Sequence, residues 1–447
     1  MLFSSIPFLY YFLPSVLILY FIIPKCMKNV VLLFSSLIFY AWGEPEYILC
    51  MIASIVIGYI SGLLIEAFRA KKLSTFFLIL SVVINLGFLF YFKFSDYWPI
   101  GISFYTFQIL SYTVDVYRGQ VSAQRNILNL GTYVAMFPQL IAGPIVRYSQ
   151  IAKELVQREH SVENCALGMR RFVFGLSKKV LLANVLGELC DIFKASDDKS
   201  ILFYWLYAVA FTLHIYFDFS GYSDMAIGLG KIMGFHFPEN FDYPYISKSM
   251  TEFWRRWHMS LGSWFRDYVY IPLGGNRVPK VRWFFNIFVV WALTGFWHGA
   301  SLNFIVWGLF FAILLILEKK WLLKYLEKSK VLGHIYVIFS VIISFVIFNG
   351  ADMGEALTYI GGMFGVLGET MISGEFIYYF RSYAVVLIVS IVLATPFCKE
   401  LAAKAVKIPF AGKILNGLEP IVLLILMIGI TAYLVDGSFN PFLYFRF

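Results

Sequence analysis

A series of apolar runs, most of them near 20 residues long and poor in charge, limits what this chain can fold into. A helix needs about 20 apolar residues to cross the hydrocarbon core of a bilayer, so these runs predict membrane-spanning helices. They lack the strict alternation of apolar and polar residues that marks the strands of a membrane barrel. The runs place expected spans near residues 6–24, 30–42, 47–66, 74–92, 172–190, 200–217, 283–299, 304–318, 331–348, 382–397 and 419–435.

Composition supports the same class. The 447 residues are 60% hydrophobic and 14% charged, whereas a soluble domain is typically about 25% charged. We therefore expect an all-α polytopic membrane protein with about eleven spans, forming a single membrane domain over residues 1–447. The net charge of +9 is explained most simply by basic cytoplasmic loops, so nucleic acid is not an expected partner.

Residues 100–148 contain apolar pieces that are too short or too interrupted to span a bilayer. Such pieces are tolerated at membrane depth only where they are buried in protein or line a cavity. This segment predicts re-entrant helices around an internal tunnel.

The lysines and arginines of the C-terminal half predict its orientation. Residues 319–330 carry five lysines and residues 398–413 carry four, whereas residues 349–380 carry neither lysine nor arginine. Basic loops stay in the cytoplasm. The two lysine-rich loops are therefore predicted to be cytoplasmic, and residues 349–380 and the tail 436–447 extracytoplasmic.

Residues 252–268 are predicted to form one amphipathic helix in the membrane interface, with its rings among the acyl chains. One face gathers aromatic and aliphatic residues, namely Phe253, Trp254, Trp257, Leu261, Trp264, Phe265 and Tyr268. Arg255, Arg256 and Arg266 lie on the opposite face. These arginines are candidates for anchoring lipid headgroups and for binding the phosphates of an acyl donor, two roles that do not exclude each other.

His298 closes the apolar run at 283–299. A lone histidine commonly has a structural role, bonded to a carbonyl, but an ionisable group at membrane depth often marks a reaction or a pathway. An imidazole with a pKa near ~6.5 can take a proton from a hydroxyl, as acyl transfer to an alcohol requires. We therefore predict His298 as a catalytic base. His258, at the edge of the aromatic face, is expected to support the site or to contact the donor.

Other ionisable residues indicate structure rather than chemistry. The six histidines have no zinc-ligand spacing, so neither a metal nor another bound cofactor is expected. No GxSxG or Walker A motif occurs, which argues against a serine hydrolase and an ATPase. Asp218 and Asp224 follow the expected span at 200–217 and are predicted to join a structural polar network.

The chain resembles a membrane-bound O-acyltransferase of the alginate and peptidoglycan O-acetyltransferase type. The resemblance covers most of the chain, in order. Its motifs are GISFYTFQ at 101–108, LIAGPIVR at 140–147, GLSKKVLLAN at 175–184, YFDFSGYSDMAIGLG at 216–230, PENFDYPY at 238–245, EFWRRWHMSLGSWFRDYVYIPLGGNR at 252–277 and GFWHGAS at 295–301.

This resemblance implies a multi-pass enzyme of the bacterial plasma membrane. His298 matches the catalytic histidine of the family, and His258 matches a second functional histidine. The glycine pair in YIPLGGNR is similar to the acetyltransferase branch, which implies an acetyl group carried by acetyl-CoA. The implied partners are this acyl donor, membrane lipid and a polysaccharide acceptor.

The tail NPFLYFRF at 440–447 resembles an aromatic C-terminal motif of the same branch. In that branch a tyrosine, matching Tyr444, is proposed to accept the acyl group before an extracytoplasmic SGNH-type acetyltransferase uses it. A terminal tyrosine beside a span is also an ordinary membrane anchor.

The sequence thus predicts a membrane O-acyltransferase that moves an acyl group from a cytosolic thioester to the extracytoplasmic side. The alternative is a transporter or flippase for a cell-envelope precursor, in which the cavity is a path and the charged residues line it. That alternative accounts for the spans but leaves the motif resemblance unexplained.

Overall fold

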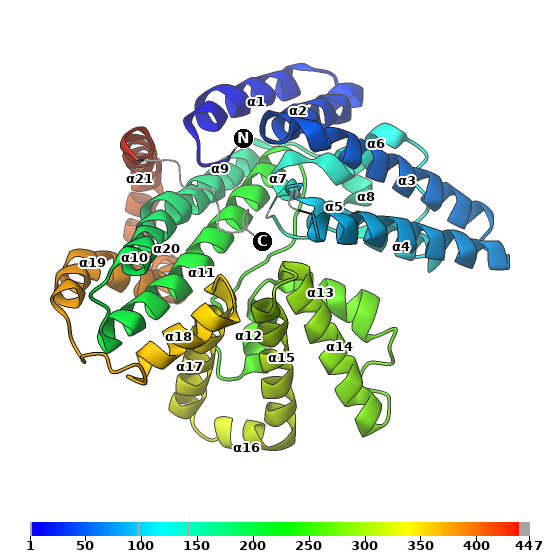
Figure 1. Cartoon of the computed structure of the whole chain (residues 1–447). Helices are drawn as coiled ribbons and strands as arrows, with labels where there is room; N and C mark the ends of the chain where they lie inside the picture. Colours follow the sequence, from blue (N-terminus) through cyan, green and yellow to red (C-terminus); the bar gives the residue numbers. More distant parts are fainter. Residues whose placement is uncertain (1, 96–98, 142, 438–447) are drawn as a thin grey trace. The chain divides into compact units, whose positions relative to one another are not determined.

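The computed structural model describes residues 2–95, 99–141 and 143–437, and it consists of helices joined by loops and short turns (Figure 1). No strand occurs among these residues, which confirms the all-α class. The chain forms two compact units. The first comprises the N-terminal stretch through Leu176 with Tyr222–Glu239 and Leu434–Gly437, and the second comprises Ser177–Gly221 and Asn240–Tyr433. The single domain expected over residues 1–447 stays a prediction.

The described residues contain eight helical segments long and apolar enough to cross a membrane, which confirms a polytopic membrane protein. They are Lys25–Gly43, Pro45–Ala67, Lys72–Lys93, Ile201–Ile232, Leu302–Leu326, Lys330–Asn349, Gly374–Leu393 and Pro409–Asp436. The expected spans at 172–190 and 283–299 lie on helices outside these eight, and the first expected span is a shorter apolar helix, Phe8–Ile22. The total of about eleven spans stays a prediction.

The first unit is built mainly from the N-terminal helices. These are α1 (Leu13–Ile22), α2 (Lys28–Gly43), α3 (Ile48–Ala67), α4 (Lys72–Lys93), α5 (Ile102–Tyr117), α6 (Ile127–Ala135), α7 (Phe137–Leu140), α8 (Tyr148–Val156) and α9 (Val162–Ser177). α5 packs against α3 because Gly62 leaves room for Tyr112, whose hydroxyl would lie 2.4 Å from a Cβ there. At 16 residues α5 is about 24 Å long, too short to cross alone, and it is buried almost throughout. α5 and residues 130–141 are thus buried in protein, as membrane depth requires, whereas most of residues 117–129 are exposed.

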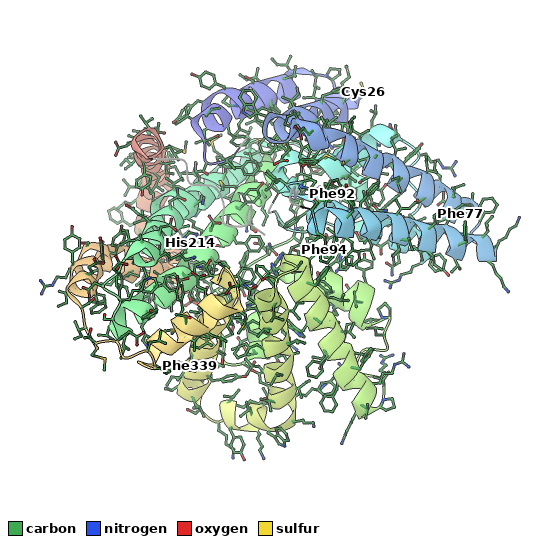
Figure 2. The ribbon with its side chains drawn as sticks, in the orientation of Figure 1. Cys26, Phe77, Phe92, Phe94, His214 and Phe339 are labelled. Atoms are coloured by element: carbon green, nitrogen blue, oxygen red, sulfur yellow. The ribbon has the colours of Figure 1, made fainter. Side chains whose placement is uncertain are left out.

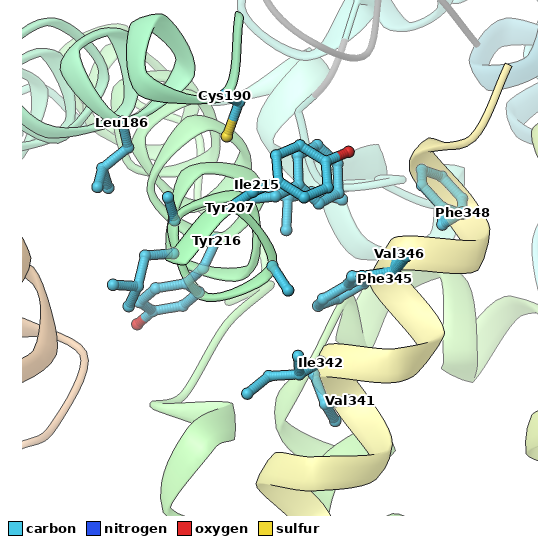
Figure 3. Close-up of a cluster of buried hydrophobic side chains, with 14 of the residues drawn as sticks. Leu186, Cys190, Tyr207, Ile215, Tyr216, Val341, Ile342, Phe345, Val346 and Phe348 are labelled. Atoms are coloured by element: carbon cyan, nitrogen blue, oxygen red, sulfur yellow. The ribbon is translucent and has the colours of Figure 1, made fainter. Parts of the chain in front are cut away.

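The second unit contains the remaining helices and three π-helical turns. The helices are α10 (Asn184–Ala195), most of α11 (Ile201–Ile232), α12 (Met250–Arg256), α13 (Met259–Phe265), α14 (Lys280–His298), α15 (Leu302–Leu317), α16 (Leu323–Leu326), α17 (Lys330–Asn349), α18 (Met353–Met363), α19 (Gly374–Leu393), α20 (Phe397–Val406) and α21 (Pro409–Asp436). The turns are η4 (Lys178–Ala183), η6 (Arg266–Tyr270) and η7 (Glu318–Leu322). Figure 3 shows part of the core, where Phe345 and Val346 of α17 lie opposite Tyr207 and Ile215 of α11.

α14, α15 and α17 run side by side with alternating direction. The contact between α14 and α15 depends on glycine, because a Cβ at Gly295 would lie 2.3 Å from the carbonyl oxygen of Phe304. At one end of the bundle, Asn303 donates a hydrogen bond to the carbonyl of Gly350 (2.9 Å), next to the end of α14. The opposite end carries Lys280, Lys319 and Lys330. His298 therefore ends its helix away from the lysines.

α11 corrects the expected boundary at residue 217, because this single helix continues to Ile232. Its 32 residues correspond to about 48 Å. Asp218 lies within the helix, where it pairs with Lys179 at 2.5 Å, and both side chains are buried. Asp224, one and a half turns later, pairs with Arg171 in the first unit (2.9 Å). The predicted structural network is therefore present, although it lies along a helix rather than at its end.

A close contact joins α11 to α10 in the second unit. His214, labelled in Figure 2, lies one turn before Asp218. A Cβ at Gly187 of α10 would lie 2.4 Å from Cε1 of this histidine. The glycine is thus needed for the close packing of the two helices.

Candidate active site

His298 is the last residue of α14, and its side chain is only 4% exposed. Three aromatic rings surround its imidazole in edge-to-face contact. The centroid distances are 4.8 Å to Trp297, 5.1 Å to Trp307 and 5.1 Å to Phe348. The next residue must be glycine, because a Cβ at position 299 would lie 2.2 Å from the ring of Phe304. The imidazole is therefore held in an apolar, close-packed setting at the end of the bundle away from the lysines.

The prediction of one unbroken helix over residues 252–268 is wrong, because the helix is interrupted at His258. α12 ends at Arg256, α13 begins at Met259, and the π turn η6 follows. His258 has a φ of +43°, in the left-handed region that a residue other than glycine seldom adopts. Such strain persists only where surrounding contacts impose it.

Asn240 supplies those contacts. Its backbone carbonyl accepts a hydrogen bond from the N–H of Met259 (3.0 Å). Its side-chain Oδ1 accepts from the backbone N–H of Ser260 (3.2 Å) and from the Ser260 hydroxyl (2.9 Å), and it lies 3.1 Å from Nδ1 of His258. The left-handed turn is thus fixed by a residue 18 positions earlier.

The same contacts define the protonation of His258. A backbone N–H can only donate, so the Asn240 atom bonded to Ser260 is the oxygen, and Nδ1 of His258 must carry the hydrogen that this oxygen accepts. Burial lowers the pKa of His258 to about 3, so the ring is neutral near pH 7. Nε2 then holds a lone pair, and it is buried without a hydrogen-bond partner among the described residues. This atom is available to accept a hydrogen bond.

The structure brings the two histidines together around Trp297. The ring centroid of Trp297 lies 4.8 Å from that of His298 and 6.2 Å from that of His258. Phe219 of α11 packs edge-to-face against His258, with the two ring centroids 4.6 Å apart. Two buried imidazoles, one with a free lone pair, therefore share one aromatic cluster within the second unit.

The sequence model of the membrane-bound O-acyltransferase (MBOAT) family matches residues 120–351 of this chain. The match covers more than half of the sequence and includes both histidines. The chain belongs to the MBOAT family.

Curated relatives of this MBOAT chain carry related activities in their names. Probable alginate O-acetylase AlgI of Pseudomonas syringae is 41% identical over 389 residues, which are 81% of this chain and 75% of the relative. Peptidoglycan O-acetyltransferase of Helicobacter pylori is 31% identical over 427 residues, covering 83% and 81%. Teichoic acid D-alanyltransferase of Bacillus subtilis is 31% identical over 241 residues, covering 51% and 61%. The predicted family is confirmed, and the MBOAT chain is an O-acyltransferase.

Glu318 fixes the start of the segment that leads to His258. Its buried carboxylate, at the end of α15, accepts hydrogen bonds from the backbone N–H (3.0 Å) and hydroxyl (2.9 Å) of Thr251, and another from the N–H of Met250. A carboxylate at a helix N-terminus is favoured by the helix dipole. The sequence prediction missed both Glu318 and Asn240, because their partners lie far away in the sequence.

The aromatic face predicted to lie in lipid is instead largely packed against protein. Phe253, Trp257, Leu261, Trp264 and Phe265 are buried, and Trp257 contacts Phe345 of α17 at 5.2 Å. A helical wheel identifies an apolar face but does not distinguish lipid from protein as its neighbour.

The three arginines proposed for donor binding lie in different surroundings. Arg255 is exposed on α12. Arg256 already pairs with Asp242 (2.8 Å) and Glu252 (3.1 Å), and Arg266 pairs with its neighbour Asp267 (2.7 Å). Among these three, Arg255 is thus the arginine without a carboxylate partner in the described structure. Tyr444 lies outside the described residues.

No group of three or more His, Cys, Asp or Glu side chains that could hold a metal ion occurs in the described parts of the MBOAT chain.

Proposed function

We propose that this enzyme transfers an acetyl group from cytosolic acetyl-CoA to the extracytoplasmic side, where a cell-envelope polysaccharide or an exopolysaccharide becomes O-acetylated. The names of the alginate and peptidoglycan relatives support acetyl as the group and a glycan as the final acceptor. The observation that carries the proposal is the pair of buried imidazoles around Trp297.

His298 acts as the general base. It takes the proton of an acceptor hydroxyl as the hydroxyl oxygen attacks the thioester carbonyl and the new C–O bond forms. The tetrahedral intermediate then collapses, the C–S bond breaks, and the imidazolium returns the proton to the departing thiolate. The balanced products are an acetyl ester and the free thiol of CoA.

His258 orients the reacting hydroxyl rather than deprotonating it. A base with a pKa of about 3 takes up protons poorly near pH 7. A buried lone pair without a partner nevertheless gains from accepting a hydrogen bond. Nε2 of His258 would accept this bond from the acceptor or the donor as it enters the pocket.

The charges at the ends of the helix bundle support the proposed direction of transfer. Lys280, Lys319 and Lys330 lie at the end opposite His298, and clustered lysines favour the cytoplasmic side. The thioester enters from this basic side, with Arg255 as its first phosphate contact. The acceptor reaches His298 from the extracytoplasmic side of the bacterial plasma membrane, where the C-terminus also lies.

Tyr444 is the first acceptor in this proposal. A phenol with a pKa near ~10 is a weak nucleophile, and general-base help from His298 would activate it. The acetylated tyrosine is an activated ester that an extracytoplasmic SGNH-type acetyltransferase could then use on the polysaccharide. The support for this step is the sequence of the tail.

The test uses the full-length enzyme in proteoliposomes supplied with acetyl-CoA labelled in the acetyl group. Replacing His298 with Ala should reduce label transfer by about 10²- to 10⁴-fold, the range that a general base contributes. A matched control is His334→Ala, since His334 bonds a backbone carbonyl near the lysine end of α17. Full activity of His298→Ala would overturn the general-base role.

The tyrosine step is tested separately. Tyr444→Phe, which removes only the hydroxyl, should abolish acetylation of the polysaccharide, and mass spectrometry should find acetyl on Tyr444 when the second transferase is absent. Unchanged product from Tyr444→Phe would show that the acceptor attacks directly, and would leave the role of His298 intact.

A further inference from the structure

A second cluster of ionisable side chains lies in the first unit, around Tyr20 at the end of α1. The hydroxyl of Tyr20 donates to the carbonyl of Met233 (2.6 Å) and lies 2.9 Å from Nε2 of His160. Because the single hydroxyl hydrogen goes to the carbonyl, Nε2–H of His160 donates to the tyrosine oxygen. These two bonds fix the position of the tyrosine ring.

Two cations lie against this ring. Nζ of Lys28 is 4.3 Å from the centroid of Tyr20, and Cζ of Arg158 is 5.9 Å from it. Arg158 also stacks on Phe235, with Cζ 4.5 Å from the ring centroid. Lys28 is only 8% exposed. Residues from α1, α2, the segment after α8 and the segment after α11 thus bring two positive charges to one aromatic surface.

These charges form no ion pair among the described residues, although the more distant carboxylate of Glu154 favours the charge on Arg158. Neither Lys28 nor Arg158 lies within ion-pair distance of a carboxylate in residues 2–95, 99–141 and 143–437. Nη1 of Arg158 is buried without a hydrogen-bond partner among them. Burial, and then the charges of Lys28 and Arg158, lower the pKa of His160. Two cations held against aromatic rings, Lys28 buried and Arg158 half-buried, are costly to desolvate unless an anion joins them.

The chemistry of this cluster suits a phosphate. A guanidinium offers a planar set of donors and an ammonium a point charge, the two groups that most often bind phosphate oxygens. α2 begins at Lys28, and its N-cap, Met27, provides no side-chain cap. A helix N-terminus favours an anion.

The surroundings indicate a lipid as the source of the phosphate. Leu19, Phe21 and Ile22 of α1 are exposed and lead away from the cluster along an apolar surface, where acyl chains would pack. Lys25, also exposed, lies on the turn between α1 and α2. Basic residues beside a span favour the cytoplasmic leaflet.

We propose that Lys28 and Arg158 bind the headgroup phosphate of an anionic phospholipid in the cytoplasmic leaflet, with Lys25 at the rim. A zwitterionic headgroup would suit the cluster less well, because its ammonium would meet the same positive charges. The site lies apart from the acyl-transfer residues in the chain, and it does not depend on the proposed reaction.

The test is native mass spectrometry of the full-length protein in detergent with added phosphatidylglycerol or phosphatidylcholine. The wild type should retain one phosphatidylglycerol through mild activation, in preference to phosphatidylcholine. Lys28→Gln with Arg158→Gln should reduce this retention at least tenfold, and Lys25→Gln alone should reduce it less. Equal retention by the wild type and the double variant would overturn the proposal.

The matched control is Lys71→Gln with Lys72→Gln. These lysines lie between α3 and α4 on the side of the membrane predicted for Lys28, and both are exposed. The control removes the same charge and should retain the lipid. If the double variant does not fold, Arg158→Lys, which keeps the charge but loses the planar donors, should weaken retention by several-fold.

A competition experiment with soluble phosphates distinguishes a lipid headgroup from a free phosphate as the ligand. Inorganic phosphate or CoA, at millimolar concentration and constant ionic strength, should not displace phosphatidylglycerol from the wild type. Displacement by either, together with no preference between the two lipids, would show that the site binds a soluble phosphate and would overturn the lipid assignment.

Discussion

α11 and α21 are both long and apolar, but they are buried to very different extents. Both are long, at 32 and 28 residues, and both are apolar enough to cross a membrane. Yet 78% of the most apolar stretch of α11 is buried within the protein, compared with 6% of that of α21. Length and apolarity therefore predict a span, but they do not predict whether protein or lipid surrounds it.

The polar residues within the apolar sequence of α11 distinguish it from α21. α11 carries His214, Asp218, Ser220 and Ser223 within its apolar sequence, and all four are buried. In an apolar interior such groups need partners, and Asp218 has one in Lys179. The same helix places Phe219 against the ring of His258. Polar residues inside a long apolar run thus mark the helix that packs against protein, including the candidate site residue His258.

The buried ion pair gives the largest expected effect. Asp218→Ala leaves the ammonium of Lys179 buried without its carboxylate, which should cost about 3–5 kcal/mol of stability. We expect a strong loss of monodisperse protein and a much lower melting temperature in detergent.

A double variant sharpens this result. Lys179→Met with Asp218→Leu replaces the pair by apolar side chains of similar size, which is often neutral for stability. This double variant should recover most of the stability that Asp218→Ala loses. If Asp218→Ala alone melts like the wild type, the pair does not hold α11 in place.

Protonation of His258, which packs against Phe219 of α11, should have an intermediate effect on stability that depends on pH. The pKa of His258 is about 3 in the folded protein and near ~6.5 when unfolded. Between these values the unfolded chain binds a proton that the folded chain does not, so stability is lost as the pH falls from about 6.5 toward 3, by at most ~1.4 kcal/mol per pH unit.

His258→Gln should flatten this dependence. Its melting temperature should fall less between pH 7 and pH 5 than that of the wild type, whereas His334→Gln should keep the wild-type slope. Equal slopes for the wild type and His258→Gln would show that the buried imidazole is not neutral.

These contrasts show which features the sequence could predict. The all-α class, most of the spans and the pair of candidate histidines follow from local patterns, namely the length of apolar runs and motifs such as GFWHGA. The break at His258 does not, because its left-handed backbone is held by Asn240, 18 residues earlier. A helical wheel assumes an unbroken helix and assigns one face to lipid, so it placed Trp257 in the membrane rather than in the core.

Long-range partners explain the other differences. The sequence predicts that the span at 200–217 ends before Asp218, because a carboxylate in lipid is unfavourable. Its neutralisation by Lys179 could not be predicted from either residue alone. The carboxylates paired with Arg256 and Arg266 are close in sequence, but a single sequence gave no reason to prefer them over donor phosphates.

The smallest expected effect is that of Leu424→Ala in α21, and comparing it with Leu213→Ala in α11 tests the distinction between the two helices directly. Leu213 of α11 is 5% exposed and Leu424 of α21 is 61% exposed. Leu213→Ala leaves a cavity among packed side chains and should cost about 2–5 kcal/mol. Leu424→Ala changes only a surface that lipid covers, and because lipid tails are as apolar as leucine, its effect should stay within about 0.5 kcal/mol. Melting of both variants in the same detergent measures the difference. A loss for Leu424→Ala as large as that for Leu213→Ala would mean that protein, for example a second copy of this chain, covers α21, and the distinction between the two helices would then fail.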